Sequence, residues 1–450
     1  MNLKSCRWAL ALAATLGTAG AWAADPFELD LAVDGQQKEF GFDNVDDAAD
    51  QLDREALLRE FPTYNDQTST VFTDINFRGL DAELNFPAAG TLLEFHINGV
   101  ELAPGQDTVS FQGQTRDESI EMLKDFLKEN KFALKNLQTR SAELTPLDPL
   151  AGNPASLMNQ RMRGDFDRGF SHRVSQIWGC GCSAFELNRP QSIEVALNDA
   201  DMSSLFAEAR ARAAALRGEN EIGVGIAGQS SRGKTANGNS YRTNLLQLPF
   251  SYTIKFDADP RKKLSFELPL SYMDSEGAAS YTAGFGIAYT HPISDKWSLT
   301  PAAGIGATGS EDLGAGGGLA SYSLTSSYSQ RLGDWALSLG NSIGRYESVG
   351  IKIGDVEAES DVQNTVFTNG LMASGPTSLI AKNIVMEYYF TDTRLTGSEL
   401  FSNRYDEVGI GLGFLKTEHG AITRYFKTGL SYLWGENDID GLRLSLNLRF

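Results

Sequence analysis

The chain ends in Leu442-Arg443-Leu444-Ser445-Leu446-Asn447-Leu448-Arg449-Phe450, and this stretch decides the fold. Successive side chains of a β-strand point to opposite faces, so residues two apart share a face. The four leucines and the terminal phenylalanine therefore lie on one face, while the arginines, the serine and the asparagine lie on the other. The pattern predicts a strand with one wholly apolar face and one polar face that stops on an aromatic residue.

This ending resembles the C-terminal strand of bacterial outer-membrane β-barrels, whose last residue is typically phenylalanine. The resemblance implies that Leu446, Leu448 and Phe450 form a signal that the barrel-assembly machinery recognises. It makes that machinery and outer-membrane lipid the expected partners, and the outer membrane of a Gram-negative bacterium the expected location.

The other end of the chain predicts export. Lys4 and Arg7 precede an apolar stretch over residues 8–21, and Ala21-Trp22-Ala23 follows as a cleavage site. These features are typical of a secretory signal peptide, which we assign to residues 1–23. Cys6 lies within it, so the mature chain retains only two cysteines.

Composition limits the remaining possibilities. After the signal peptide, the sequence contains no run of about eighteen apolar residues, so no transmembrane helix is predicted. The formal net charge of −19 argues against a nucleic-acid partner. Glycine is abundant, with 45 residues, and concentrates in the second half, where apolar and polar residues alternate.

Residues 219–450 contain about twelve alternating segments of roughly ten residues each, which is the signature of a transmembrane β-barrel. In one of them, Leu248, Phe250 and Tyr252 share a face opposite Ser251 and Thr253. Aromatic residues near the segment ends match interfacial girdles. A soluble sandwich is disfavoured, because the polar face carries charges that suit a lumen. We predict these lumen charges at Glu267, Glu387, Arg443 and Arg449.

A helix is expected over residues 199–218, just before the first strand. Asp199 and Asp201 begin it, basic residues end it, and Gly218 follows, which suits the helix macrodipole. A helix directly before a barrel of about twelve strands resembles the translocator domain of autotransporters, where it runs inside the lumen. The resemblance implies that Arg210, Arg212 and Arg217 of this plug helix meet lumenal carboxylates such as Glu267. The alternative is a periplasmic helix packed on the N-terminal domain.

The chain departs from large autotransporters in lacking a long repetitive passenger and an evident Asn-Asn cleavage pair. Residues 24–140 instead predict a small α+β domain, and residues 141–198 a linker region. The linker contains Cys180 and Cys182, whose spacing in an oxidising periplasm favours a local disulfide over a metal site.

No catalytic motif is recognisable, and no cofactor or metal is expected. A Ser/His/Asp hydrolase would have to use His96 or His172, and neither lies in a signature sequence. The predicted fold class is therefore mainly β: a C-terminal antiparallel transmembrane barrel, a small N-terminal α+β domain and a lumenal or pre-barrel helix. The expected function is non-enzymatic, namely anchoring or exporting the N-terminal domain. An outer-membrane pore for small solutes is the first alternative, and an outer-membrane hydrolase is the second.

Overall fold

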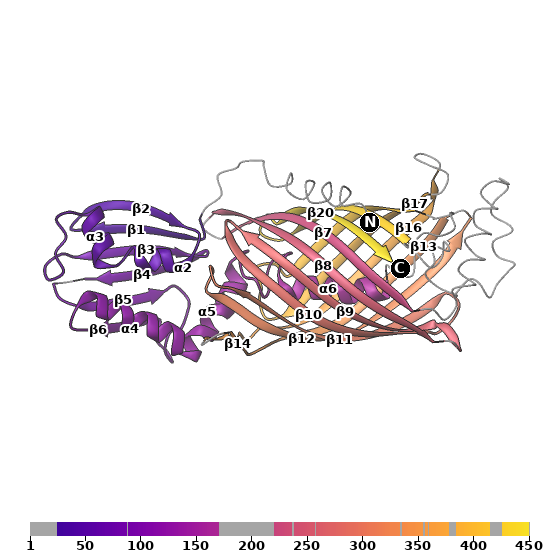
Figure 1. The fold of residues 1–450 in the computed structure, drawn as a ribbon, viewed down its shortest axis with the longest axis horizontal. Helices are drawn as coiled ribbons and strands as arrows, with labels where there is room; N and C mark the ends of the chain where they lie inside the picture. Colours follow the sequence, from indigo (N-terminus) through magenta and orange to yellow (C-terminus); the bar gives the residue numbers. More distant parts are fainter. Residues whose placement is uncertain are drawn as a thin grey trace.

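The structure is a computed structural model in which a small domain stands at one end of a barrel (Figure 1). It describes residues 25–87, 89–170, 220–235, 238–256, 258–333, 335–353, 356–358, 360–377, 384–414 and 425–449. The predicted signal peptide and the predicted helix over residues 199–218 lie outside these ranges, so both remain predictions.

The small domain is a six-stranded antiparallel sheet with helices on one face. Its strand order is β2-β1-β3-β4-β5-β6. Alternation builds its core: Phe27, Leu29 and Leu31 on β1 are buried, while the residues between them face outward. The elements are β1 (Phe27–Val33), β2 (Gln36–Phe42), α2 (Val45–Asp50), α3 (Arg54–Glu60), β3 (Val71–Phe77), β4 (Leu80–Phe86), β5 (Leu92–Ile97), β6 (Thr108–Gln112), α4 (Arg116–Glu129) and α5 (Lys131–Leu144).

The second half forms a closed antiparallel barrel of twelve strands, which confirms the predicted fold class. Each strand pairs with its neighbour in the chain, and β20 pairs with β7 to close the ring. The strands are β7 (Glu221–Lys234), β8 (Ser240–Phe256), β9 (Asp259–Ser275), β10 (Ala278–Pro292), β11 (Trp297–Ser310), β12 (Ala315–Leu332), β13 (Trp335–Val349), β16 (Gln363–Thr377), β17 (Ile384–Gly397), β18 (Arg404–Phe414), β19 (Tyr425–Gly435) and β20 (Asp440–Arg449). A short hairpin, β14 (Ile351–Ile353) with β15 (Val356–Ala358), extends the connection between β13 and β16.

The outer wall of the barrel is apolar. Leu268, Phe285 and Ile305 are each between 47% and 62% exposed, although they lie near the middle of their strands. Aromatic pairs stand nearer the two rims, such as Tyr272 with Tyr281 at one end and Phe256 with Tyr289 at the other. An apolar band between aromatic girdles is the lipid-facing surface of a membrane barrel, so the soluble sandwich is excluded.

Among the described residues, the hydrogen bonds between the small domain and the barrel lie at one rim of the barrel. Asn76 donates to the Tyr241 hydroxyl at 2.9 Å, and the Val45 amide donates to the Asp312 carbonyl at 2.9 Å. Thr139 accepts from the Asp361 amide at 3.0 Å. These barrel residues all belong to one end, which is opposite the end where β7 begins and β20 finishes.

Between the domain and the barrel, the chain turns into the lumen. Residues 145–156 are all buried at the rim that carries the domain. They lead into α6 (Leu157–Gly169), which lies inside the barrel (Figure 1). The sequence analysis placed this segment in a linker and missed the helix. None of the described helices is both long enough and apolar enough to cross a membrane.

A charge placed in the apolar band tests which face meets lipid. We expect Leu324→Arg, near the middle of β12, to destabilise the barrel by about 2–4 kcal/mol, because arginine at the bilayer midplane costs that much. Leu332→Arg, at the rim end of β12, is the matched control and should cost about 0–1 kcal/mol. The measurement is the temperature at which the folded, fast-migrating form disappears in detergent gels. Equal effects of the two changes would contradict a membrane-embedded wall.

Candidate functional site in the barrel lumen

The lumenal helix α6 carries several charged residues beside an apolar stripe of Met158, Met162 and Phe166. Ser156 caps its N-terminus by accepting from the Asn159 amide, and the Arg161 and Asp165 side chains pair one turn apart. These local signals and the apolar stripe all favour a helix. A helix of this kind needs a polar surrounding, and the inward face of a membrane barrel supplies one.

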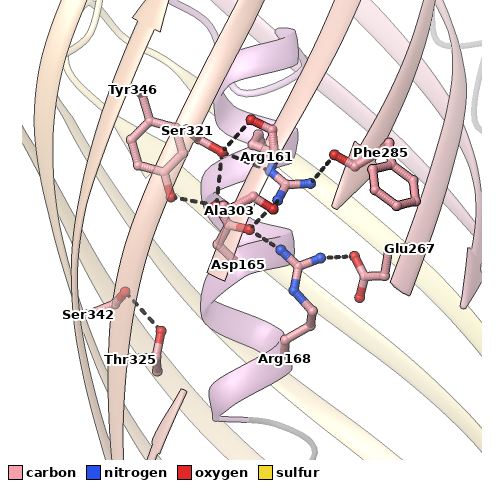
Figure 2. A network of polar contacts seen from close by, with 11 residues as sticks. Arg161, Asp165, Arg168, Glu267, Phe285, Ala303, Ser321, Thr325, Ser342 and Tyr346 are labelled. Atoms are coloured by element: carbon pink, nitrogen blue, oxygen red, sulfur yellow. Dashed lines mark hydrogen bonds and ion pairs between the residues drawn. The ribbon is translucent and has the colours of Figure 1, made fainter. Parts of the chain in front are cut away.

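The first polar cluster ties one side of α6 to strands β9 to β13 (Figure 2). Arg161 contacts Asp165 at 2.9 Å, and it donates to the Ala303 carbonyl and the Ser321 hydroxyl at 3.0 Å each. Arg168 pairs with both Asp165 and Glu267. Tyr346 donates its hydroxyl to Asp165 at 3.1 Å. Each charge in this cluster thus has an opposite charge or a directed hydrogen bond.

The glycines of the barrel wall make room for this contact. A Cβ added at Gly286 or Gly304 would collide with the Arg161 guanidinium. On the next strands, a Cβ at Gly340 would collide with Phe170. The wall can approach the helix closely only because these positions carry no side chain. These wall glycines therefore leave space for α6.

A second polar cluster lies on the other side of α6. Arg163 forms an ion pair with Glu407 of β18, which also accepts from the Tyr389 hydroxyl at 3.2 Å. Lys427 of β19 pairs with Glu387 of β17, whose side chain is only 2% exposed. Arg443 of β20 donates to Gln229 at 3.4 Å.

The charges of the two clusters balance. On α6, three arginines and two aspartates give +1. On the wall, three glutamates, one lysine and one arginine give −1. The wall residues are Glu267, Glu387, Glu407, Lys427 and Arg443. A balanced set of paired charges can be held away from bulk water, whereas an uncompensated one cannot.

Of the predicted lumen charges, Glu267, Glu387 and Arg443 point inward and lie in these clusters. Arg449 lies on β20, but its side chain is outside the described residues. Leu446 and Leu448 alternate with Ser445 and Asn447 on β20, as predicted. Six predicted residues lie outside the described ranges: Phe450, Arg210, Arg212, Arg217, Cys180 and Cys182. Their roles remain predictions.

The partner expected for Glu267 from the sequence was an arginine of the predicted helix over residues 199–218. The structure gives Glu267 a different partner, Arg168. The residues that sequence reasoning missed are the charged positions of α6 and Glu407. A signal existed in Ser156 as a helix cap and in the four-residue spacing from Arg161 to Asp165.

The junction between the domain and the lumen holds a buried arginine. Arg78, in the turn between β3 and β4, is fully buried and donates to the Ser141 hydroxyl at 3.0 Å. Burial lowers the pKa of Arg78 to about 10, against the opposing attraction of Asp148. Burial likewise raises the pKa of Asp148, whose carboxylate caps the Leu150 and Ala151 amides at 2.9 Å each. The attraction between these two charges joins the domain to the segment that fills the rim.

Space remains beside α6. The helix packs on β10 to β13, and a cavity of about 310 Å³ lies among α6, β7 to β11 and β16 to β20. Its lining includes Gln160 and Arg163 of the helix and Lys427 and Arg443 of the wall. The helix therefore occupies the lumen without filling it.

The described residues offer little for other chemistry. Among them, no group of three or more His, Cys, Asp or Glu side chains could hold a metal ion. His96 lies on β5, where its ring contacts the Asp107 carbonyl and the Thr108 hydroxyl rather than a serine. His172, the other candidate of the hydrolase alternative, lies outside the described ranges.

No protein-family model matches the chain, and no curated protein matches it. Among solved structures, it is similar to the β domain of the Bordetella autotransporter BrkA, with 15% identity, 50% of this chain and 98% of that chain covered, and a TM-score of 0.37. It is also similar to the translocator domain of the autotransporter NalP from Neisseria meningitidis, with 12% identity, coverages of 56% and 97%, and a TM-score of 0.40. The KdgM porin gives 11% identity, coverages of 51% and 99%, and a TM-score of 0.31.

These neighbours include translocators and porins, so they do not choose between the two functions. The likeness to these structures is one of fold, a closed antiparallel barrel of twelve strands.

Removing one partner from the first cluster should destabilise the protein. We expect Arg168→Met to cost about 3–5 kcal/mol, because Glu267 is left in the lumen without its ion pair. Adding Glu267→Gln to that variant should recover part of the loss. The exposed pair of Arg232 with Asp440 provides the control, and Arg232→Met should cost about 1 kcal/mol or less. Thermal unfolding in detergent measures all three, and a loss no larger than the control's would contradict a role for the pair in holding α6.

Proposed function

We propose that this protein is a non-enzymatic surface anchor: the barrel holds the N-terminal domain at the cell exterior, and α6 is the segment that passes through the lumen. The observation that carries the proposal is the position of the two ends of the barrel relative to the domain. The domain contacts one rim, whereas Gly223 of β7 and Arg449 of β20 pair at the other.

Orientation follows from how such barrels are built. Their short turns face the periplasm and their longer loops face outward. The connection from β13 to β16, which carries the β14–β15 hairpin, lies at the domain rim, where the Lys135 side chain pairs with Asp361 at 3.6 Å. The turns from β10 to β11 and from β12 to β13 lie at the opposite rim and are short. This arrangement supports an outward-facing domain and periplasmic barrel ends.

The burial of residues 145–156 supports an anchor over an open pore. Leu150 and Ala151 pack with Phe401 and Leu433 in one apolar cluster at the domain rim. The Phe401 amide donates to the Ala142 carbonyl at 2.9 Å, so the rim and the incoming chain share backbone bonds. A mouth filled by protein supports a lumen that is closed to solutes.

A pore for small solutes is the second candidate, because the cavity beside α6 gives it a specific basis. A conduit would require that cavity to connect past the segment at the domain rim. The two functions differ in conductance and in where the domain lies, so one experiment addresses each.

Labelling of intact cells tests the position of the domain. In a chain with Cys180 and Cys182 replaced by serine, we expect Asp74→Cys, on the open face of the domain's sheet, to react with a membrane-impermeant maleimide. Lys296→Cys, in the turn from β10 to β11, is the control and should react only after the outer membrane is permeabilised. The reverse pattern would place the domain in the periplasm and overturn the proposal.

Single-channel recording tests the pore. We expect the whole protein to conduct poorly in a planar bilayer and a barrel that begins at residue 220 to conduct well, because the truncation removes residues 145–156 and α6. Equal conductance of the two would favour the pore. Recovery of both from detergent as heat-modifiable barrels is the control for folding.

A further inference from the structure

Four inward-facing residues without polar side chains form one row across neighbouring strands: Gly225 on β7, Pro249 on β8, Pro269 on β9 and Gly284 on β10. Pro249 lies directly opposite Pro269 in the ladder between β8 and β9. The pairs Val224–Phe250 and Ala227–Gln247 place Gly225 opposite Pro249 by the same register. The four residues therefore lie side by side across the strands, along the direction of the ladder hydrogen bonds.

The pairing of neighbouring strands is interrupted at two places in this row. Between β7 and β8 the paired residues stop at Val224–Phe250 and resume at Ala227–Gln247. Between β9 and β10 they stop at Ala283–Leu270 and resume at Gly286–Glu267. Proline has no N–H to donate, so a strand interior that carries it loses a ladder hydrogen bond. The pairing of the strands is therefore interrupted on both sides of the Pro249–Pro269 pair.

The glycines are matched to the proline rings. A Cβ added at Gly225 would lie 2.9 Å from Cγ of Pro249, and a Cβ at Gly284 would lie 3.3 Å from Cγ of Pro269. Any larger residue would push against the ring at Gly225. The four positions therefore form one feature.

The lumenal cavity reaches the wall at this row. All four residues line it, and so do Phe250 and Ile305, which belong to the outward-facing rows of β8 and β11. Outside, the row is flanked by exposed apolar side chains. These are Leu248, Phe250, Leu268, Leu270 and Phe285. The cavity and the lipid-facing side chains thus lie on opposite faces of the same strands at this row.

We propose that this row is a lateral portal through which one acyl chain of an outer-membrane lipid enters the cavity beside α6. The occupant is hydrocarbon because the outside of the row is apolar and lies between the two aromatic girdles. A cavity of about 310 Å³ is at the lower end of the range for small-ligand sites. The portal is independent of the surface-anchor function, since neither depends on the other.

Pro301 on β11 is a strand proline that lacks the cavity behind it. The ladder between β10 and β11 also lapses beside it, between Ala288–Ala302 and His291–Leu299. Pro301 faces outward, and it does not line the cavity. It therefore provides a matched control with a lapsed ladder and no space behind it.

The test uses the full-length protein in vesicles of a phospholipid that carries a photoactivatable diazirine on one acyl chain. Mass spectrometry then maps the labelled residues. We expect labelling at the inward-facing Ser251 and Thr282, which line the cavity, in addition to the outer wall. The double variant Pro249→Thr/Pro269→Thr restores both N–H donors, and we expect it to reduce inward labelling about tenfold. Pro301→Thr should leave inward labelling unchanged.

Labelling of the outer wall in the same samples shows that each variant has inserted. If the double variant does not assemble, Ser251→Trp fills the cavity without altering the ladder and should abolish labelling at Thr282. Native protein labelled only on outward-facing residues would overturn the portal. Inward labelling that persists at full strength in the double variant, or in Ser251→Trp, would also overturn it.

Discussion

The ion pairs between α6 and the barrel wall are the interaction on which the rest of the arrangement depends. A charge inside the lumen is out of bulk water, and it is tolerated only when an opposite charge and directed hydrogen bonds compensate it. Arg168 satisfies that condition through Asp165 and Glu267, and Arg163 does so through Glu407. Because the helix carries +1 and the facing wall −1, neither is a stable surface without the other. The charges therefore select a barrel with its helix inside.

The position of the N-terminal domain follows from that contact. Once α6 is fixed, residues 145–156 must leave the lumen at the rim near Leu157, and the domain is held there. Arg78 and Asp148 then bury a cation and an anion at the same junction. Burial makes both charged forms costly, so this pair specifies how the domain docks more than it adds to the free energy of unfolding.

Sequence reasoning predicted the barrel well because the lipid environment leaves a strict pattern. The wall must present apolar residues outward on every strand, and Leu248, Phe250 and Tyr252 show this period directly. It failed at α6 although Met158, Met162 and Phe166 recur every four residues as an apolar stripe. The proline-rich stretch before the helix and the charged residues within it favoured a linker instead. Glu267, Glu387 and Arg443 were found since inward charges follow from the strand period, but their partners required the fold.

Glycine explains why the helix lies to one side of the lumen. Gly286, Gly304, Gly340 and Gly370 lie on β10, β11, β13 and β16, and their lack of a side chain lets the backbone of the wall approach Arg161 and Phe170. The opposite wall carries Glu387, Glu407, Lys427 and Arg443, whose long side chains hold α6 at a distance. A cavity on that side is the necessary result of the two surfaces. It extends to the glycine and proline row of β7 to β10, where the ladder is interrupted on both sides of Pro249 and Pro269, so the position of the helix also determines which part of the wall the cavity reaches.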